Sequence, residues 1–198
     1  MPHHQPYQVE GFHGCDKETG IKVLNGEMDL IPSNNSWDWL GNGIYFWEYN
    51  PQRALEYAME SSQGKQFNKK QIHTPFVLGA IIELGNCLNL VEPSSIEILK
   101  EAYKKLAEIF KKSNSPMPQN KENNRALDCA VIKYIHQTRK EMNLLPYDTV
   151  RSPFSEGGEA YSGTFFTTRH HIQINVINPN KIKGIFLPRP IKQYNPNL

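Results

Sequence analysis

The sequence predicts an α+β fold, because segments with the period of β-strands and segments with the period of helices occupy separate parts of the chain. Segments 7–14, 76–90 and 164–188 have strand character, whereas segment 94–142 has helical periodicity. Helices segregated from strands in this way are typical of α+β domains. At 198 residues the chain is expected to form a single domain over residues 1–198.

Composition excludes several classes of protein and partner. Hydrophobic residues make up 38% of the chain and charged residues 21%, as in an ordinary globular domain. The net charge of +2 gives no field strong enough to indicate nucleic acid or an anionic membrane as partner. Cys15, Cys87 and Cys129 are widely spaced, which favours a reducing compartment. Without a signal-peptide core or an apolar run of roughly 18 residues, we expect a cytoplasmic protein that does not contact membranes.

The first predicted element is a strand over 7–14, YQVEGFHG, in which polar and apolar residues alternate. His13 and Gly14 are expected at its C-terminal end. Glycine there allows another group to approach the backbone closely. Cys15 has no orienting partner in the sequence, so we do not expect a thiol nucleophile. A short helix closed by Gly26 is expected next.

The second predicted unit combines a strand and a helix. A GxG turn at Gly41 and Gly43 precedes the aromatic strand 44–48. The helix that follows is expected to begin with Asn50 as N-cap and Pro51 at its first position. The apolar, β-branched run 76–90 then predicts a central strand that ends at a Leu-Gly-Asn turn.

Residues of about 94–142 are expected to form a two-helix insertion. The first helix has apolar residues at helical spacing, and Ser94 with Glu97 predicts a capping box at its start. In the second helix Leu127, Val131 and Ile135 form one apolar face.

The last third of the chain is expected to hold a glycine-rich loop, SPFSEGGEAY, followed by strands. Glu156 and Glu159 lie in that loop. Gln173 stands between two isoleucines of a strand, so period-2 alternation turns it away from their face. The adjacent His170 and His171 point to opposite faces of the same strand, and we therefore expect no metal site.

The order of these motifs resembles the catalytic domain of the poly(ADP-ribose) polymerase-like, or diphtheria-toxin-like, ADP-ribosyltransferases. The matching features are His13-Gly14, the GxGIYF run from Gly41 to Phe46, the helix with Ala54 and Tyr57, the strand ending in Leu-Gly-Asn, and the late strand before Asn178-Pro179. The likeness covers about residues 9–90 and 170–187. It implies a split β-sandwich of two antiparallel sheets with flanking helices.

The resemblance also implies a substrate and roles for single residues. NAD+ would be bound without a metal, with Gly14 on the nicotinamide carboxamide and Tyr45 and Tyr57 on either side of the nicotinamide ring. His13 would donate a hydrogen bond to the adenosine ribose. Gly43 belongs to the turn before the tyrosine strand. Gln173 occupies the position of the family's glutamate, which is a departure from the pattern.

Cleavage of the bond between nicotinamide and ribose passes through a transition state with oxocarbenium character, which a carboxylate stabilises. The amide of Gln173 can bond a ribose hydroxyl but offers neither a general base nor a full negative charge. We therefore expect Glu156 to activate the acceptor. Arg151 is expected either to bind the NAD+ pyrophosphate or to form a structural ion pair with Glu156.

The function implied by the resemblance is mono-ADP-ribosylation of a macromolecular acceptor, protein, RNA or DNA. A toxin or defence effector, with an antitoxin or inhibitor protein as a further partner, fits small members of the superfamily. Three alternatives stay open at this point. They are a non-catalytic module that binds NAD+ or ADP-ribose, an NAD+ glycohydrolase, and an RNA 2′-phosphotransferase of related fold.

Overall fold

The computed structural model describes residues 8–64, 72–121 and 124–198. In chain order the strands are β1 (Gln8–Asp16), β2 (Ile44–Glu48), β3 (Pro75–Glu83), β4 (Cys87–Asn89), β5 (Asn120–Lys121), β6 (Asn124–Arg125), β7 (Thr149–Glu159), β8 (Thr167–Val176) and β9 (Ile182–Phe186). The helices are α1 (Lys17–Leu24), α2 (Pro51–Ser62), α3 (Pro93–Lys112), α4 (Ala126–Glu141), the 3-10 turn η1 (Pro179–Lys181) and α5 (Ile191–Tyr194). The α+β class is confirmed.

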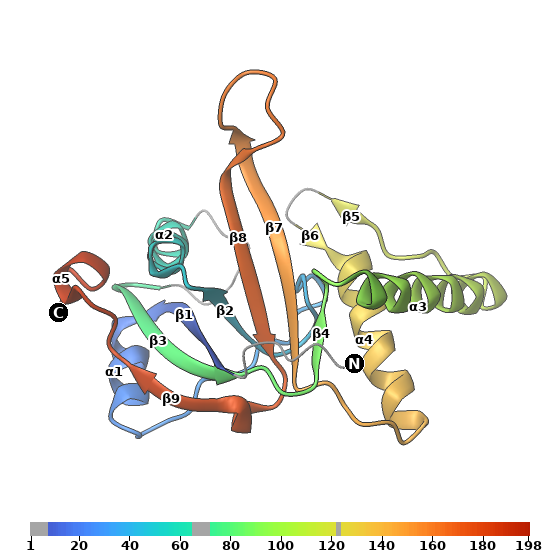
Figure 1. Ribbon diagram of the computed structural model, residues 1–198, viewed down its shortest axis with the longest axis horizontal. Helices are drawn as coiled ribbons and strands as arrows, with labels where there is room; N and C mark the ends of the chain where they lie inside the picture. Colours follow the sequence, from blue (N-terminus) through green and yellow to red (C-terminus); the bar gives the residue numbers. More distant parts are fainter. Residues whose placement is uncertain (1–7, 65–71, 122–123) are drawn as a thin grey trace.

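A mixed sheet of seven strands forms the centre of the molecule (Figure 1), in the order β4-β7-β8-β2-β1-β3-β9. Its neighbours are antiparallel except β4 and β7, which run parallel, and β5 and β6 form a separate ribbon. We predicted a split β-sandwich of two antiparallel sheets, whereas here all seven strands are hydrogen-bonded into one mixed sheet. Strand twist accumulates across the sheet, so that β9 and β8 run in clearly different directions in Figure 1.

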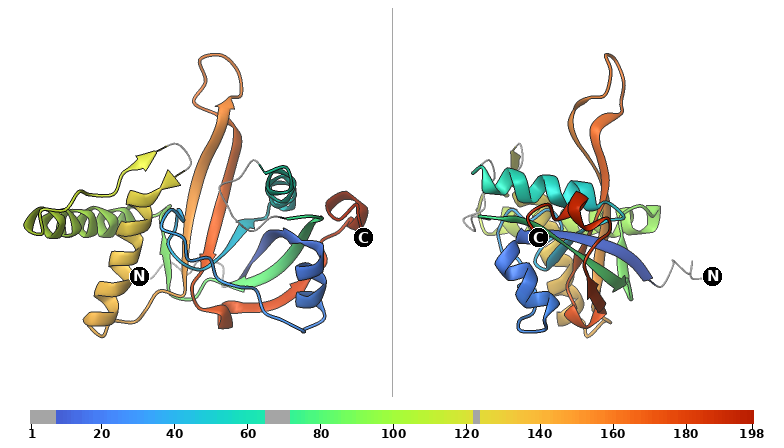
Figure 2. Two further views of the ribbon diagram at one scale, coloured as in Figure 1. Left: turned by 180° about the vertical axis from the view of Figure 1, so that it is seen from behind. Right: turned by 90° about the vertical axis from the view of Figure 1, so that its left-hand side faces the viewer.

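Helices cover both faces of this sheet, with α1 and α2 on opposite sides (Figure 2). We call one side the α2 face. It carries Phe12 and Trp47 beneath α2 and Val150 beneath α3 and α4. The other side, the α1 face, carries a larger cluster that includes Phe46 and Ile174. The predicted two-helix insertion is thus observed as α3 and α4, packed beside β7.

Local signals placed one helix start correctly and another wrongly. Oδ1 of Asn50 accepts a hydrogen bond of 2.9 Å from the N–H of Arg53, and Pro51 is the first residue of α2, as predicted. The capping box of Ser94 is wrong, because α3 begins at Pro93 and has no side-chain cap bond. Proline at the first helical position sets the start one residue earlier.

Two strands extend further than their sequence patterns suggested. β1 continues to Asp16, which pairs with Pro75, so His13 lies inside the strand and not at its end. The predicted glycine-rich loop is strand: Glu156 and Glu159 both lie on β7, with a register shift between them. Gly157 has a φ of +80°, which accommodates that shift. The β7–β8 hairpin projects beyond the rest of the molecule (Figure 1).

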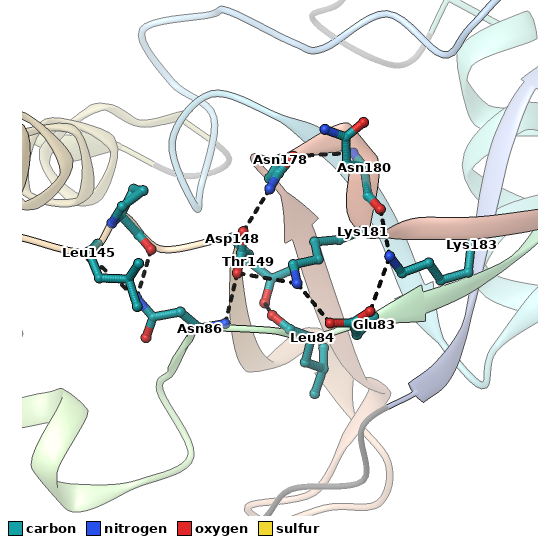
Figure 3. Close-up of polar contacts among 11 residues, drawn as sticks. Glu83, Leu84, Asn86, Leu145, Asp148, Thr149, Asn178, Asn180, Lys181 and Lys183 are labelled. Atoms are coloured by element: carbon teal, nitrogen blue, oxygen red, sulfur yellow. Dashed lines mark hydrogen bonds and ion pairs between the residues drawn. The ribbon is translucent and has the colours of Figure 1, made fainter.

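A polar network ties the base of this hairpin to the turn after β3 and to β9 (Figure 3). Oδ2 of Asp148 accepts from the N–H of Asn86 at 2.9 Å, and its Oδ1 accepts from Nδ2 of Asn178 at 2.8 Å. Lys181 joins this network to Glu83 through a contact of 2.7 Å. Hydrogen bonds from lysines of the β9 segment hold the pKa of Glu83 below its usual value.

Replacing Asp148 with alanine should lower the free energy of unfolding by about 2 kcal/mol, because the donors of Asn86 and Asn178 lose a shared acceptor. Urea titration followed by tryptophan fluorescence measures this change. Glu101→Ala is the matched control, since this carboxylate contacts only the exposed Lys104 among its described ion pairs. Equal midpoints for the two variants would contradict a stabilising role for the network.

Candidate functional site

The hydrogen-bonded pairing between β1 and β2 stops beside His13. Phe12 and Trp47 form the last described pair. One step further, Nδ1 of His13 lies 2.8 Å from the carbonyl oxygen of Tyr45. Because a carbonyl oxygen only accepts, Nδ1 carries the proton and donates it to this oxygen. The imidazole thus takes the hydrogen bond that the backbone of β1 would make to Tyr45 if the two strands continued to pair.

This tautomer changes the role expected of His13. Burial lowers the pKa of His13, although its bond to Tyr45 acts in the opposite direction, so the ring is neutral near pH 7. With Nδ1 protonated, Nε2 presents a lone pair. We predicted that His13 donates to a ribose hydroxyl, whereas this geometry makes it an acceptor.

Gly14 is the residue whose backbone faces the gap between β1 and β2. On the other side it lies opposite Val77 of β3. The N–H and C=O of Val77 bond the side chain of Asn195, at 2.8 and 3.1 Å. In an antiparallel pair, two opposite residues either exchange both backbone hydrogen bonds or turn their N–H and C=O groups away from each other. Val77 uses these groups to bond Asn195, so the N–H and C=O of Gly14 point the other way, toward β2. They form an adjacent donor and acceptor.

Strand register distributes the predicted site residues over the two faces of the sheet. Trp47 lies opposite Gln173, and Tyr45 lies opposite Asn175, so Tyr45 and Gln173 share one face. By the same alternation the α2 face holds Gly14, Gly43, Tyr45, Glu156 and Gln173, and the α1 face holds His13 and Arg151. The side chains of His13, Tyr45 and Gln173 therefore do not share a face. The imidazole of His13 contacts only the backbone carbonyl of Tyr45 in the described hydrogen bonds.

The phenol of Tyr45 is fixed by the turn that precedes β2. Its hydroxyl donates to the carbonyl of Gly41 at 2.6 Å and accepts from the N–H of Leu40 at 2.9 Å. Burial raises the pKa of Tyr45 well above its usual value, so the phenol stays protonated. A Cβ on Gly43 would lie 2.0 Å from Oδ1 of Asn175, so only glycine fits in this turn.

We predicted that Tyr45 and Tyr57 lie on either side of a nicotinamide ring, and in the structure Tyr57 contacts Trp47. Its ring packs on Trp47, with centroids 5.0 Å apart and planes at 45°. Trp47 is 5% exposed and stands two residues from Tyr45 on the same face. The aromatic residues of the α2 face thus include Trp47, which no motif in the sequence indicates as a site residue.

A cluster of polar residues, which we call the Glu156 cluster, joins α2 to the β7–β8 hairpin. It consists of Arg53, Glu156, His171 and Gln173. Nη2 of Arg53 donates to Oε2 of Glu156 at 3.0 Å. Nε2 of His171 lies 3.9 Å from the same oxygen and 3.2 Å from Nε2 of Gln173. The side chain of His171 therefore lies between those of Glu156 and Gln173.

Two donors at this cluster, Nε of Arg53 and Nε1 of the neighbouring Trp47, are buried without a hydrogen-bond partner among the described residues. Nη1 of Arg53 lies 3.8 Å from Oε2 of Glu60. Burial lowers the pKa of His171, although Glu156 opposes the shift, so the ring is neutral near pH 7. The amide nitrogen of Gln173 then donates to Nε2 of His171.

Arg151 is engaged on the α1 face. Its Nε and Nη2 bond the two oxygens of Glu48 at 2.6 and 2.9 Å, and its Nη1 bonds Oδ1 of Asn89 at 3.2 Å. The predicted ion pair between Arg151 and Glu156 is wrong, because Glu156 lies on the other face and pairs with Arg53. Contact with a pyrophosphate would require Arg151 to leave this two-point pair with Glu48.

A groove of about 470 Å³ lies between α3, α4 and β7 on the α2 face. Ser152 and Phe154 line it, and each is the cross-strand partner of a residue of the Glu156 cluster, Gln173 and His171 respectively. The ring of Phe154 stacks on that of His171 at 5.9 Å. The groove and the Glu156 cluster are thus adjacent.

The free energy of unfolding should fall as the pH decreases below about 6.5. Burial lowers the pKa of His13, His136 and His171 in the folded protein, so the unfolded chain binds protons that the folded one does not. Urea midpoints at about pH 7.5 and about pH 5 test this. His13→Asn keeps a donor for the Tyr45 carbonyl but does not titrate, and should show a smaller loss. An unchanged loss in that variant would contradict the assignment.

Cys15 lies two residues after His13 on β1 and is a buried free cysteine. Burial raises the pKa of the Cys15 thiol to about 12, so its reactive thiolate form is scarce near pH 7. Among the described residues no group of three or more His, Cys, Asp or Glu side chains is placed to hold a metal ion. No helix of the described ranges has the length and apolar character to cross a membrane.

Comparison of the chain with models of protein families, with curated proteins and with solved structures gives no match.

Proposed function

We propose that the protein is an NAD+-dependent mono-ADP-ribosyltransferase with a poly(ADP-ribose) polymerase-like catalytic core, built on the twisted seven-stranded sheet. One observation carries the proposal: the backbone of Gly14 faces the gap between β1 and β2, and Tyr45 and Gln173 lie on the neighbouring face. A carboxamide has one donor side and one acceptor side. The N–H and C=O of Gly14 are complementary to both.

The reaction breaks the bond between C1′ of the ribose and the nicotinamide nitrogen. Nicotinamide leaves with the bonding electron pair, and positive charge develops at C1′. A nucleophilic atom of the acceptor then bonds C1′ and gives up its proton. Gln173 would hold a hydroxyl of this ribose, and Glu156 would receive the proton. The short path from Glu156 through His171 to Gln173 supports this division of roles.

Glu156→Gln should lower the rate of transfer to the acceptor by about 100-fold, because a neutral amide does not accept the proton. The affinity for NAD+ should change little, since Glu156 bonds Arg53 and not the dinucleotide in this account. Steady-state kinetics with varied NAD+ separate the two effects. Glu159→Gln is the matched control three residues along the same strand. Full transfer activity in Glu156→Gln would refute the assigned role.

The direct test is incubation of the purified protein with NAD+ labelled in the adenosine part, in a cell lysate, followed by protease or nuclease digestion of the labelled material. A label that one digestion releases supports transfer to that class of acceptor. Free ADP-ribose alone identifies an NAD+ glycohydrolase. Label that stays in intact NAD+ refutes both activities.

A second candidate is a non-catalytic module that binds NAD+ or ADP-ribose. Two observations favour it: Gln173 is neutral, and the carboxylate of Glu156 is held by Arg53. Binding of NAD+ with no nicotinamide release and no adduct would establish this alternative. Action as a toxin or defence effector, with an inhibitor protein as partner, is a further proposal that follows from the family resemblance alone.

A further inference from the structure

The end of the β7–β8 hairpin presents three aromatic side chains to solvent. Phe165 is 101% exposed, Phe166 64% and Tyr161 65%, and we call these three residues the aromatic tip. The hairpin carries them beyond the rest of the molecule (Figure 1). A single exposed apolar residue is ordinary on a protein surface, but clustered aromatic rings are the side chains that anchor protein interfaces. The aromatic tip therefore indicates a contact that the single chain does not make.

The loop that holds the aromatic tip is fixed by its own hydrogen bonds. The N–H of Thr164 donates to the carbonyl oxygen of Tyr161 at 3.2 Å, and the N–H of Gly163 donates to Oε2 of Glu159 at 3.0 Å. A loop with a fixed shape loses little conformational entropy when it binds. Glu159 is the only charged residue of segment 157–168, so the tip offers no cation to a nucleic acid phosphate or an anionic lipid. These features favour an apolar cavity of a protein as partner.

The groove between α3, α4 and β7 is an apolar cavity of suitable size. Its volume is about 470 Å³, and since a cavity of about 150 Å³ takes up a benzene ring, the groove has room for two rings. The rings of Trp39 and Phe154 pack on each other at 4.8 Å, and the remaining walls are mainly aliphatic. These walls come from Leu90, Ile96, Leu99, Leu127 and Val131. Lys100 lines the same groove, and its charge is opposite to that of Glu159 beside the aromatic tip.

The aromatic tip does not reach the groove of its own chain. Phe154 lines the groove, and the six residues from there to Ala160 span about 20 Å of extended chain. β7 and β8 stay paired up to Glu159 and Thr167, which keeps the hairpin from folding back. A second copy removes this obstacle. When two hairpins lie antiparallel around a twofold axis, the tip of each copy points toward the groove of the other.

The area of such a contact matches that of a stable dimer only when it is made twice. Three aromatic side chains with the observed exposure offer on the order of 400 Å² for burial, and the groove contributes a similar area. One tip in one groove thus buries about 800 Å², which is the size of a casual contact. Two reciprocal contacts bury about 1,600 Å², which is typical of specific, stable interfaces.

We propose that the protein forms a twofold-symmetric dimer in which the aromatic tip of each copy inserts into the groove between α3, α4 and β7 of the other. Because both copies use the same two surfaces, the assembly closes at two chains and does not grow into a filament. The inference uses neither NAD+ nor any catalytic role, so it stands or falls independently of the proposed function.

Sedimentation equilibrium of the full chain over a series of concentrations tests the dimer. We expect the unaltered protein to pass from monomer to dimer and to form no larger species. Phe165→Ser should weaken dimerisation by at least about tenfold, because each copy loses an anchor. Leu145→Ser is the matched control, since this side chain is 69% exposed and precedes β7 at the end opposite the tip. A monomer at every concentration, or equal dimerisation of the two variants, would overturn the inference.

A photoreactive residue tests the groove as the binding surface. Phe165→p-benzoylphenylalanine keeps an aromatic ring at the tip, and illumination should attach it to peptides of α3 or the start of α4. A mixture of isotope-labelled and unlabelled chains should give mixed pairs, which shows that the link joins two copies. Links that lie only outside the groove would overturn the inference. Binding of a monomer to vesicles of phosphatidylcholine, with no dimer, would assign the tip to a lipid surface and also overturn it.

Discussion

Alanine in place of Gly14 is expected to lower the free energy of unfolding by about 3 kcal/mol. An added Cβ would lie 2.3 Å from the carbonyl oxygen of Ala54 and 3.3 Å from the Cβ of Ala58. Both alanines are fully buried where α2 packs against β1. The first clash is with helix backbone, which cannot rotate away as a side chain would. The helix must therefore move, and the contact between Trp47 and Tyr57 would move with it.

Chemical unfolding followed by circular dichroism measures this effect. Gly158→Ala is the matched control, because a Cβ at that position meets no atom within 4 Å. We expect its midpoint to stay within the error of the unaltered protein. A Gly14→Ala protein as stable as this control would show that α2 does not press on β1 as described.

Gln173→Ala is expected to lower the rate of nicotinamide release by about 100-fold. The side chain is 9% exposed, and under the proposed function its amide holds the ribose beside C1′. Its loss also removes the hydrogen bond to His171, so the imidazole is no longer oriented. Gln137→Ala is the matched control, since Gln137 bonds only Glu141 on the exposed side of α4 in the described contacts.

Gln173→Glu tests the same position in the other direction. A carboxylate here matches the residue of the family that the sequence resembles and, under the proposed function, would stabilise the positive charge at C1′, so we expect faster nicotinamide release than in the unaltered protein. The measurement is release of nicotinamide labelled in its ring, with saturating NAD+. Unchanged rates in both Gln173 variants would mean that this side chain does not contact the reacting ribose.

Elements set by short-range signals were predictable from the sequence. The cap of Asn50 and the position of Pro51 fixed the start of α2. The apolar spacing of α3 indicated its buried side only in part, because Leu106 is buried but Tyr103 is 47% exposed. These features depend on residues three or four positions apart. The start of α3 shows the limit of such signals, because the proline at position 93 dominated over the apparent capping box.

The arrangement of the candidate site was predictable only in part, because it depends on pairing between distant strands. The ion pair of Arg53 with Glu156 joins residues 103 positions apart, and no local pattern indicates it. The face of His13 follows from its register with β3, which continues beyond the expected end of β1. One signal was present: His171 and Gln173 are two residues apart on a strand, so alternation placed them on the same face.

Under the proposed function the backbone of Gly14 binds the nicotinamide carboxamide at the gap between β1 and β2. A titration of isotope-labelled protein with nicotinamide, followed by nuclear magnetic resonance of the backbone amides, tests this contact. We expect the Gly14 amide resonance to move with the ligand, together with that of Tyr45, while that of Gly158 on the distant hairpin stays in place. Saturable binding that leaves the Gly14 amide unmoved, or no binding at all, would refute the contact.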